Sequence, residues 1–308
     1  MNGLPANHRE VEGCPKKLPV VGAVVLNWNR PEDTRLCVES LKASDYTLLR
    51  IVVIDNGSDV VQYEKLKKAL TGVEIIRSEI NLGFGRGNNI GIRYFLEQGA
   101  AYVLLINNDT LVDPQMVGIL VNAMESDPSI GAAGPIIYYM SEPEKVWFAG
   151  YRFRDKLYVL RRGLHLKPPI KPVEYVDFIS GCGMLLRREV LEQVGGFSPE
   201  YFMYYEDLDL CVRIRKAGWK IACVTIAKMW HAVSASLGGI ESPVKQYYQV
   251  RSSLVFYRRH TRGFVFIVNI CLRLLHAAYS SIRYLLTKGL NGSLIRYYLR
   301  GIKEGVQG

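Results

Sequence analysis

An acidic cluster at residues 205–209, with the sequence Tyr-Glu-Asp-Leu-Asp, is the segment of this chain best suited to acid–base chemistry. The apolar residues after Asp207 recur at i+3, i+4 and i+7, which predicts a helix with Asp207 on its inward face. Acidic residues in a first helical turn usually offset the helix dipole, and this role accounts for Glu206 and Asp209. It does not account for an inward carboxylate. Because burial raises a carboxyl pKa and the dipole lowers it, we expect Asp207 to accept a proton from a hydroxyl near neutral pH.

Polar residues follow three short apolar runs at the point where each run ends. They are Asn27-Trp28-Asn29-Arg30, Asp55-Asn56-Gly57-Ser58 and Asn107-Asn108-Asp109-Thr110. Any one of these segments could be a turn or a helix cap. Ligands of parallel sheets bind at the carboxyl ends of the strands, so the three segments together predict a nucleotide site.

A glycine-spaced loop at residues 81–89 precedes a predicted helix. Glycines and a helix N-terminus let backbone N–H groups bind an anion. The G-x-G-x-G spacing is not a dinucleotide fingerprint, and the loop lacks the Lys-Ser or Lys-Thr pair of a P-loop. The alternative is a glycine turn capped by asparagines, which the loop taken alone favours.

Asp109 is the natural candidate for a metal ligand. A divalent cation such as Mg²⁺ or Mn²⁺ that bridges a diphosphate binds a carboxylate and keeps other positions for phosphate and water. A second ligand could come from His231, which follows the apolar run at 221–226. A lone histidine beside a tryptophan is more often structural, so this hypothesis depends on the polar strand ends.

The elements that must position these residues alternate from residue 18 onward between apolar runs and helical patterns. This alternation is typical of an α/β fold around a mainly parallel sheet. Amphipathic helices are predicted near Pro31 and after Pro114, and residues 151–173 predict a loop or irregular hairpin. Strands covered on both faces are predicted where Val, Ile and Leu are consecutive, at 20–26, 51–54, 73–76 and 102–106.

The tail from residue 263 mixes leucines with arginines and lysines, which predicts helices with a basic face. Such helices can lie on an anionic membrane surface, or they can pack as a pair on the rest of the protein; both alternatives stay open. The apolar stretch at 264–275 is interrupted and too short to span a bilayer.

The formal net charge of +10 implies an acidic partner, which could be nucleic acid, a membrane surface or a phosphorylated substrate. The basic residues gather in the tail and at 152–162 and do not alternate with aromatics, so we expect no nucleic-acid binding. The six cysteines form no C-x-x-C pair, and residues 1–17 lack the apolar region of a secretion signal. These features favour a cytoplasmic protein, either soluble or peripheral at the inner face of the membrane.

Taken together, the motifs resemble glycosyltransferase family 2, whose nucleotide-binding fold is called GT-A. The similarity is carried, in order over residues 18–260, by the segments 24–30, 53–58, 81–84, 107–109 and 205–209. The Asn107-Asn108-Asp109 form and the segment 181–188 are most similar to bacterial rhamnosyltransferases of cell-surface polysaccharide assembly.

The resemblance implies a role for each matching residue. Asp109 and His231 would hold the metal diphosphate, and Asp207 would be the base of an inverting reaction. Glu206 and the segment with Gly181, Cys182 and Gly183 would face the acceptor. The nucleotide would be bound by Asn27, Asn29, Arg30, Asp55, Gly83, Asn88 and Asn108.

The resemblance also implies the domains and the substrates. A polar segment at 1–17 would precede a GT-A catalytic domain at 18–260, with a nucleotide-sugar half at 18–135 and an acceptor half at 136–260, followed by a basic helical extension at 261–308. The donor would be a nucleoside diphosphate sugar, with a deoxyhexose such as rhamnose expected. The acceptor would be a saccharide or a lipid-linked saccharide, used in polysaccharide or glycolipid assembly.

Two departures from the family pattern bear on these expectations. Asn107 stands where the family often has the first aspartate of Asp-x-Asp, which weakens the expectation of metal dependence. Ser252 stands where relatives commonly have asparagine, and the role of that segment is open.

Two other functions remain as alternatives. A nucleotidyltransferase would need its glycine-rich loop directly after the first strand, where this chain has Asn27-Trp28-Asn29. A nucleotide-sugar binding protein without transfer activity would leave the inward Asp207 unexplained.

Overall fold

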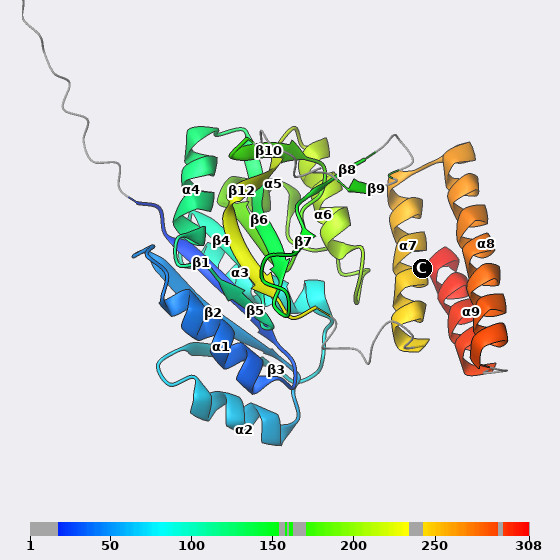
Figure 1. The fold of residues 1–308 in the computed structure, drawn as a ribbon, viewed down its shortest axis with the longest axis horizontal. Coiled ribbons are helices and arrows are strands. Elements are labelled where there is room, and N and C mark those ends of the chain that lie inside the picture. Colours follow the sequence, from blue (N-terminus) through cyan, green and yellow to red (C-terminus); the bar gives the residue numbers. More distant parts are fainter. Residues whose placement is uncertain are drawn as a thin grey trace, which may run out of the picture.

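The fold is that of a computed structural model, which describes residues 18–153, 158, 160–162, 171–233, 243–288 and 292–307. It has an α/β body with a sheet between helices, and a separate group of three helices on one side (Figure 1). The predicted polar segment 1–17 lies outside the described residues, as does much of the predicted loop at 151–173. The residues of that loop that are described include a short hairpin of β8 (Tyr151–Phe153) and β9 (Leu160–Arg162).

The first half of the sheet is parallel, as the apolar runs predict. Its strands lie in the order β3-β2-β1-β4, and each ends one or two residues beyond the predicted run. Helix α1 has its proline in the first turn, where the missing N–H costs nothing. The bounds are β1 (Val21–Asn27), α1 (Pro31–Lys42), β2 (Leu49–Asn56), α2 (Val60–Ala69), β3 (Glu74–Ser78), α3 (Phe84–Glu97) and β4 (Tyr102–Asn107).

Strand β1 shows how the fold sets the direction of the polar side chains at the strand ends. Successive side chains of a strand point to opposite faces. Val24 and Leu26 lie against glycines of α3, so Asn27 points to the other face, where the hydroxyl of Thr34 on α1 donates a hydrogen bond to it. The strand therefore delivers a polar side chain to the α1 side at its carboxyl end.

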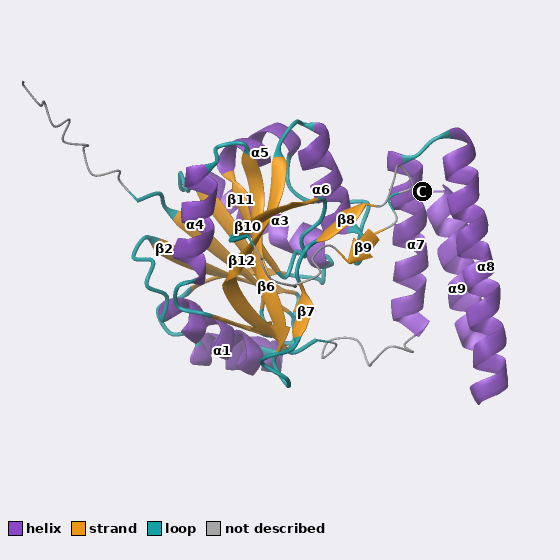
Figure 2. Cartoon of the chain, turned by 45° about the horizontal axis from the view of Figure 1, so that its top comes forward, coloured by secondary structure: helices purple, strands orange, loops and turns teal. Residues whose placement is uncertain are grey.

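The second half of the sheet is mixed. Strand β11 runs antiparallel to both β4 and β6, and β12 is parallel to β6 before its last residues pair with β5. Figure 2 shows the strands gathered between helices on both sides. The bounds are β5 (Thr110–Val112), α4 (Met116–Ser126), β6 (Ile130–Tyr139), β7 (Val146–Phe148), β10 (Val173–Val176), β11 (Gly183–Arg187), α5 (Arg188–Val194), α6 (Glu206–Lys216) and β12 (Lys220–His231).

Three helices follow the sheet: α7 (Pro243–His260), α8 (Gly263–Lys288) and α9 (Gly292–Gln307). Helices α8 and α9 confirm the helical tail, but α7 was not predicted from the sequence. Val255, Phe256 and Tyr257 of α7 join the main core, whereas Val250 and Leu254 form a small second core with residues of α8 and α9. Helix α7 therefore connects the α/β body to the outer helices. No helix in the described part of the chain is long and apolar enough to cross a membrane.

Candidate active site

A cavity of about 300 Å³ lies at the carboxyl ends of β4 and β12, beside the start of α6. Its volume is at the lower end of the range for small-molecule sites. Three of the four residues on which the sequence hypothesis rests line it, namely Asp109, Asp207 and His231. The fourth, Asp55, is not among the residues lining this cavity.

Asp109 and His231 are a hydrogen-bonded pair, although 122 positions separate them. The strand pair β5 and β12 sets Thr110 opposite His231, and the N–H of Ala232 donates to the carbonyl of Asp109. The imidazole Nε2 is 3.0 Å from Asp109 Oδ1, and its Nδ1 is buried with no hydrogen-bond partner among the described residues. Burial raises the pKa of Asp109, but the hydrogen bond and charge of His231 outweigh it and hold that pKa below its ordinary value. The pair therefore places a carboxylate oxygen and an imidazole nitrogen side by side at the cavity.

Asp207 sits in the first turn of α6 and accepts two backbone hydrogen bonds. Gly181 N–H donates to one carboxylate oxygen at 3.1 Å, and Leu208 N–H donates to the other at 2.8 Å. These bonds favour the ionised form, but burial raises the pKa of Asp207 above its ordinary value. A residue at position 181 larger than glycine would place its Cβ within 3.3 Å of the Asp207 side chain.

Glu206 also lines the cavity, and its Oε2 is buried without a hydrogen-bond partner. Burial and the neighbouring charge of Asp207 raise the pKa of Glu206 well above its ordinary value. Burial raises the pKa of both neighbouring carboxyls, so Glu206 and Asp207 titrate as a coupled pair above the ordinary carboxyl range.

The turn before α6 has an unusual backbone. Tyr204 and Tyr205 are consecutive residues with φ of 66° and 67°, a region that residues other than glycine seldom occupy. The turn is tied from outside, because the hydroxyl of Ser252 on α7 donates to the carbonyl of Met203 at 2.7 Å. The position that departs from the family pattern thus helps to hold the loop that carries Glu206 and Asp207.

The glycine loop packs against this turn and does not present its N–H groups to the cavity. Gly83 has φ of 81°, and an added Cβ would collide with the carbonyl of Phe202. That same carbonyl accepts the N–H of Phe84, and Asn81 accepts the N–H of Gly83. These bonds form a glycine turn with a capping asparagine, and anion binding by the rest of the loop stays a prediction. The loop does contribute the ring of Phe84 to the cavity wall.

The polar strand ends form one hydrogen-bond chain across three strands and α1. Asn108 donates to the hydroxyl of Thr34, which donates to Asn27, and Asn27 donates to Asp55 at 2.8 Å and to Ser58 at 3.1 Å. Asn27 and Asp55 are fully buried. Asn27 therefore fixes Asp55 in place, and its direct contact with a base, which the resemblance implied, stays a prediction.

The remaining nucleotide candidates are dispersed. Asn88 is buried in α3, where it donates to the carbonyl of Phe84. Asn29 and Arg30 line a second cavity, of about 540 Å³, beside α1 and α2. Arg77 lies over Asp55, with its Nε 3.6 Å from Asp55 Oδ2, and sequence reasoning did not identify it because nothing in the pattern of β3 marks it.

The predicted acceptor residues are divided. Gly181 and Cys182 line the cavity, together with the unpredicted Trp147 and Lys245. Gly183 belongs to β11, where it pairs with Ile106. Burial raises the pKa of Cys182 to about 12, so its thiol stays protonated and is no nucleophile.

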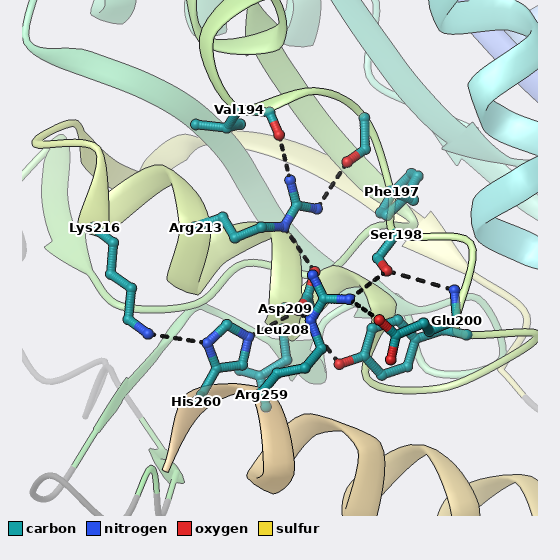
Figure 3. Close-up of polar contacts among 12 residues, drawn as sticks. Val194, Phe197, Ser198, Glu200, Leu208, Asp209, Arg213, Lys216, Arg259 and His260 are labelled. Carbon is teal, nitrogen blue, oxygen red and sulfur yellow. Dashed lines mark hydrogen bonds and ion pairs between the residues drawn. The ribbon is translucent and has the colours of Figure 1, made fainter. Parts of the chain in front are cut away.

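Asp209 has a different role from the one that the sequence suggested. It does more than offset the helix dipole, because its side chain is fully buried among cations (Figure 3). Arg213 on α6 donates to it at 2.8 Å, and His260 at the end of α7 contacts it at 2.8 Å. Arg259 lies 3.3 Å away and also binds Glu200. This network joins α6 to α7.

Replacing Asp209 by asparagine is expected to destabilise the fold by about 1.5–3 kcal/mol, because it removes a buried carboxylate that accepts charge-assisted hydrogen bonds from partly exposed partners. Burial raises the pKa of Asp209, but His260 and Arg213 outweigh it and hold that pKa low. The stabilisation is therefore present above the unfolded pKa of about 3.9 and is lost as pH falls through the lower folded value. Urea unfolding at pH 7 and pH 3 measures both effects. The control Glu192→Gln removes an exposed pair with Arg188 and should change stability by about 1 kcal/mol or less; equal losses in the two variants would contradict the prediction.

The α/β sheet, the polar strand ends and the carboxylates in one cavity define a glycosyltransferase of the GT-A fold. The model of the family described as glycosyl transferase family 2 matches residues 23–195, and the chain belongs to this family. A second model, described as the N-terminal domain of galactosyltransferase, matches residues 164–233.

Curated relatives include bacterial rhamnosyltransferases. The chain is 28% identical over 247 residues to N-acetylglucosaminyl-diphospho-decaprenol L-rhamnosyltransferase of Mycobacterium tuberculosis, covering 71% of this chain and 78% of that protein. It is also 28% identical over 217 residues to the dTDP-rhamnosyl transferase RfbF of Shigella flexneri, covering 68% of this chain and 71% of the relative.

Solved structures confirm the predicted fold class. The mannosyltransferase PcManGT of Pyrobaculum calidifontis, in complex with GDP-Man and Mn²⁺, superposes with a TM-score of 0.56 at 13% identity, covering 94% of this chain and 88% of its own. GalNAc-T7 with UDP, GalNAc and Mn²⁺ superposes with a TM-score of 0.58 at 17% identity. That superposition covers 95% of this chain but only 56% of GalNAc-T7.

Proposed function

We propose that this glycosyltransferase inverts the sugar carbon by direct displacement, with Asp207 as the base that takes the proton of the acceptor hydroxyl. The observation that carries the proposal is the common cavity of Asp207 and the Asp109–His231 pair. A displacement needs a base on one side of the sugar and charge stabilisation for the departing diphosphate on the other. The cavity supplies a candidate for each.

Asp109 and His231 would hold a divalent metal with the diphosphate of the donor. Their donor atoms fit, because Asp109 Oδ1 and His231 Nε2 lie 3.0 Å apart, close enough to be neighbouring ligands of one cation that takes the place of the shared proton. Within the described ranges no group of three or more His, Cys, Asp or Glu is placed to hold a metal, so the other ligands would come from phosphate and water. When bound, the cation neutralises negative charge on the leaving diphosphate.

The donor half of the proposal rests on Asp55. Its Oδ2 is buried without a hydrogen-bond partner, under the guanidinium of Arg77. Asp55 would bind the base or ribose once Arg77 has moved, with Asn27 and Ser58 holding it in place. We propose a nucleoside diphosphate deoxyhexose such as a rhamnose donor, because the relatives named above are rhamnosyltransferases.

The acceptor would enter past Gly181 and Cys182. A protonated Glu206 can donate a hydrogen bond to an acceptor hydroxyl and still leave Asp207 free to receive a proton. The name of the mycobacterial relative gives a diphospho-decaprenol acceptor, and Lys245 lines the same cavity here. We therefore propose a saccharide acceptor carried on a lipid phosphate, used in polysaccharide or glycolipid assembly at the cytoplasmic side.

A panel of nucleotide sugars tests the proposal. Each sugar is assayed for release of free nucleoside diphosphate with and without Mg²⁺ or Mn²⁺, in the presence of a saccharide acceptor. We expect one nucleoside diphosphate deoxyhexose to be used, with turnover that depends on the metal and a product of inverted anomeric configuration. Retained configuration would exclude direct displacement with Asp207 as base. If a nucleotide sugar instead reacts only when inorganic pyrophosphate is added, and yields a nucleoside triphosphate and a sugar 1-phosphate, the chain would be a nucleotidyltransferase.

A further inference from the structure

The outermost helix, α8, leaves an apolar face uncovered. Six large apolar residues on it are between 44% and 79% exposed: Phe264, Ile267, Leu272, Leu274, Leu275 and Tyr279. Phe264, Ile267, Cys271, Leu275 and Tyr279 follow one another at steps of three and four residues, so they lie along one side of the helix. We call Phe264, Ile267, Cys271, Leu275 and Tyr279 the α8 stripe. At about 1.5 Å per residue, it is about 22 Å long.

The opposite side of α8 is the side that packs. Ile270 contacts the small core of Val250 and Leu254 on α7, and Phe266 packs against the main core. The helix lies at the end of the molecule farthest from β1 to β3, with α7 between it and the sheet (Figure 1). The stripe therefore faces away from the catalytic body, and nothing in the described part of the chain covers it.

The net positive charge of the chain comes from the same three helices. Residues 243–308 contain 11 of the 39 lysines and arginines and one of the 29 acidic residues, so they account for the whole formal net charge of +10. The preceding 242 residues are balanced, with 28 of each sign. Arg262, Arg296 and Lys303 are described as exposed. An apolar stripe on a strongly basic helical unit is complementary to a surface that is both apolar and anionic.

We propose that α8 docks this enzyme onto the surface of an anionic lipid bilayer, with the α8 stripe in the interface between head groups and acyl chains. The basic residues of the helical unit would attract the anionic head groups. A second copy of the chain is the less suitable occupant, because pairing two stripes would bring two units of the same high charge together. The inference goes beyond sugar transfer, since it assigns a surface distant from the cavity.

Vesicle sedimentation of the full chain tests the proposal without any sugar nucleotide, so its outcome is independent of the catalytic function. Vesicles of phosphatidylcholine alone are compared with vesicles that also contain phosphatidylglycerol. We expect binding to the anionic vesicles that weakens as salt rises, because salt screens the attraction. The double variant Phe264→Glu/Leu275→Glu is expected to bind about tenfold or more weakly, because it removes two apolar side chains from the interface.

The matched control is Val60→Glu/Val61→Glu on α2. These valines are 66% and 62% exposed, and the substitution changes the net charge by the same amount as the stripe variant. The control should bind the vesicles nearly as well as the wild type. Arg262→Gln/Arg296→Gln/Lys303→Gln should weaken binding to anionic vesicles only. Circular dichroism and thermal melting confirm that each variant is folded.

Three results would overturn the proposal. One is a wild-type chain that does not sediment with anionic vesicles. Another is equal binding by the stripe variant and the α2 control. The third is a dimer in light scattering that the stripe variant dissociates while vesicle binding is absent, which would assign the face to self-association.

Discussion

Asp207→Asn is expected to lower the transfer rate by about 10²–10⁴-fold, the usual contribution of a well-placed general base. The amide keeps the size of the side chain and can still accept one of the hydrogen bonds from Gly181 and Leu208. It cannot take a proton from the acceptor. Donor affinity, measured by calorimetry with the nucleoside diphosphate, should change little, so the loss should appear in kcat.

The pH dependence separates this role from a structural one. Because burial raises the pKa of Asp207, the wild-type rate should rise with pH through a value above the ordinary carboxyl range, and this rise should be absent from the residual activity of the variant. The control Asp45→Asn alters an exposed carboxyl outside the cavity and should leave kcat unchanged. A variant at position 207 that keeps more than a few per cent of wild-type turnover would remove Asp207 from the role of base.

Asp109→Asn is expected to cost about 10²-fold or more in kcat/KM, since a metal that stabilises a leaving group contributes several kcal/mol. The substitution removes the charge that the metal requires and leaves His231 with a neutral partner. Mn²⁺ binding in the presence of the nucleoside diphosphate, measured by calorimetry, should weaken in parallel. His231→Ala should act in the same direction.

A nearby aspartate supplies the control for this variant. Asp113 comes directly after β5, four residues after Asp109, and its side chain accepts the N–H of Gln115. Asp113→Asn therefore changes the local charge by the same amount and leaves the cavity as it is. It should keep both activity and Mn²⁺ binding. If Asp109→Asn behaved in the same way as Asp113→Asn, the metal proposal would fail, although Asp207 could still be the base.

The sheet and the helices of the first half could be predicted because each follows from a local pattern. The strand at 20–26 is continuous in apolar residues because both of its faces are covered. Helix α1 could be predicted from its first-turn proline and its apolar repeat. The mixed second half of the sheet was harder to predict from the sequence. Strand β11 is short, and its antiparallel pairing with β4 joins residues 77 positions or more apart, which no local pattern encodes. Helix α7 was missed because one of its sides contacts the core and another the outer helices, so its apolar residues form no single stripe.

The site was predictable in its chemistry and less so in its geometry. The sequence identified Asp109, Asp207 and His231 as reactive, and whether they act as proposed stays a prediction. It could not reveal that Asn27 and Asp209 are wholly enclosed, because their burial depends on Thr34, His260 and Arg259, which come from other elements. Arg77 was missed for the same reason, since its position over Asp55 results from the pairing of β2 and β3.

The two tyrosines with left-handed backbone before α6 link the stability of the fold to the position of the candidate base. Each such residue costs on the order of 1–3 kcal/mol, which the surrounding structure must offset. Glycine at either position would relax the backbone, but it would remove the Tyr204 ring from the cavity wall or the Tyr205 ring from its contact with Phe256. It would also loosen the turn that positions the candidate base, so this turn is a poor place to seek thermostable variants.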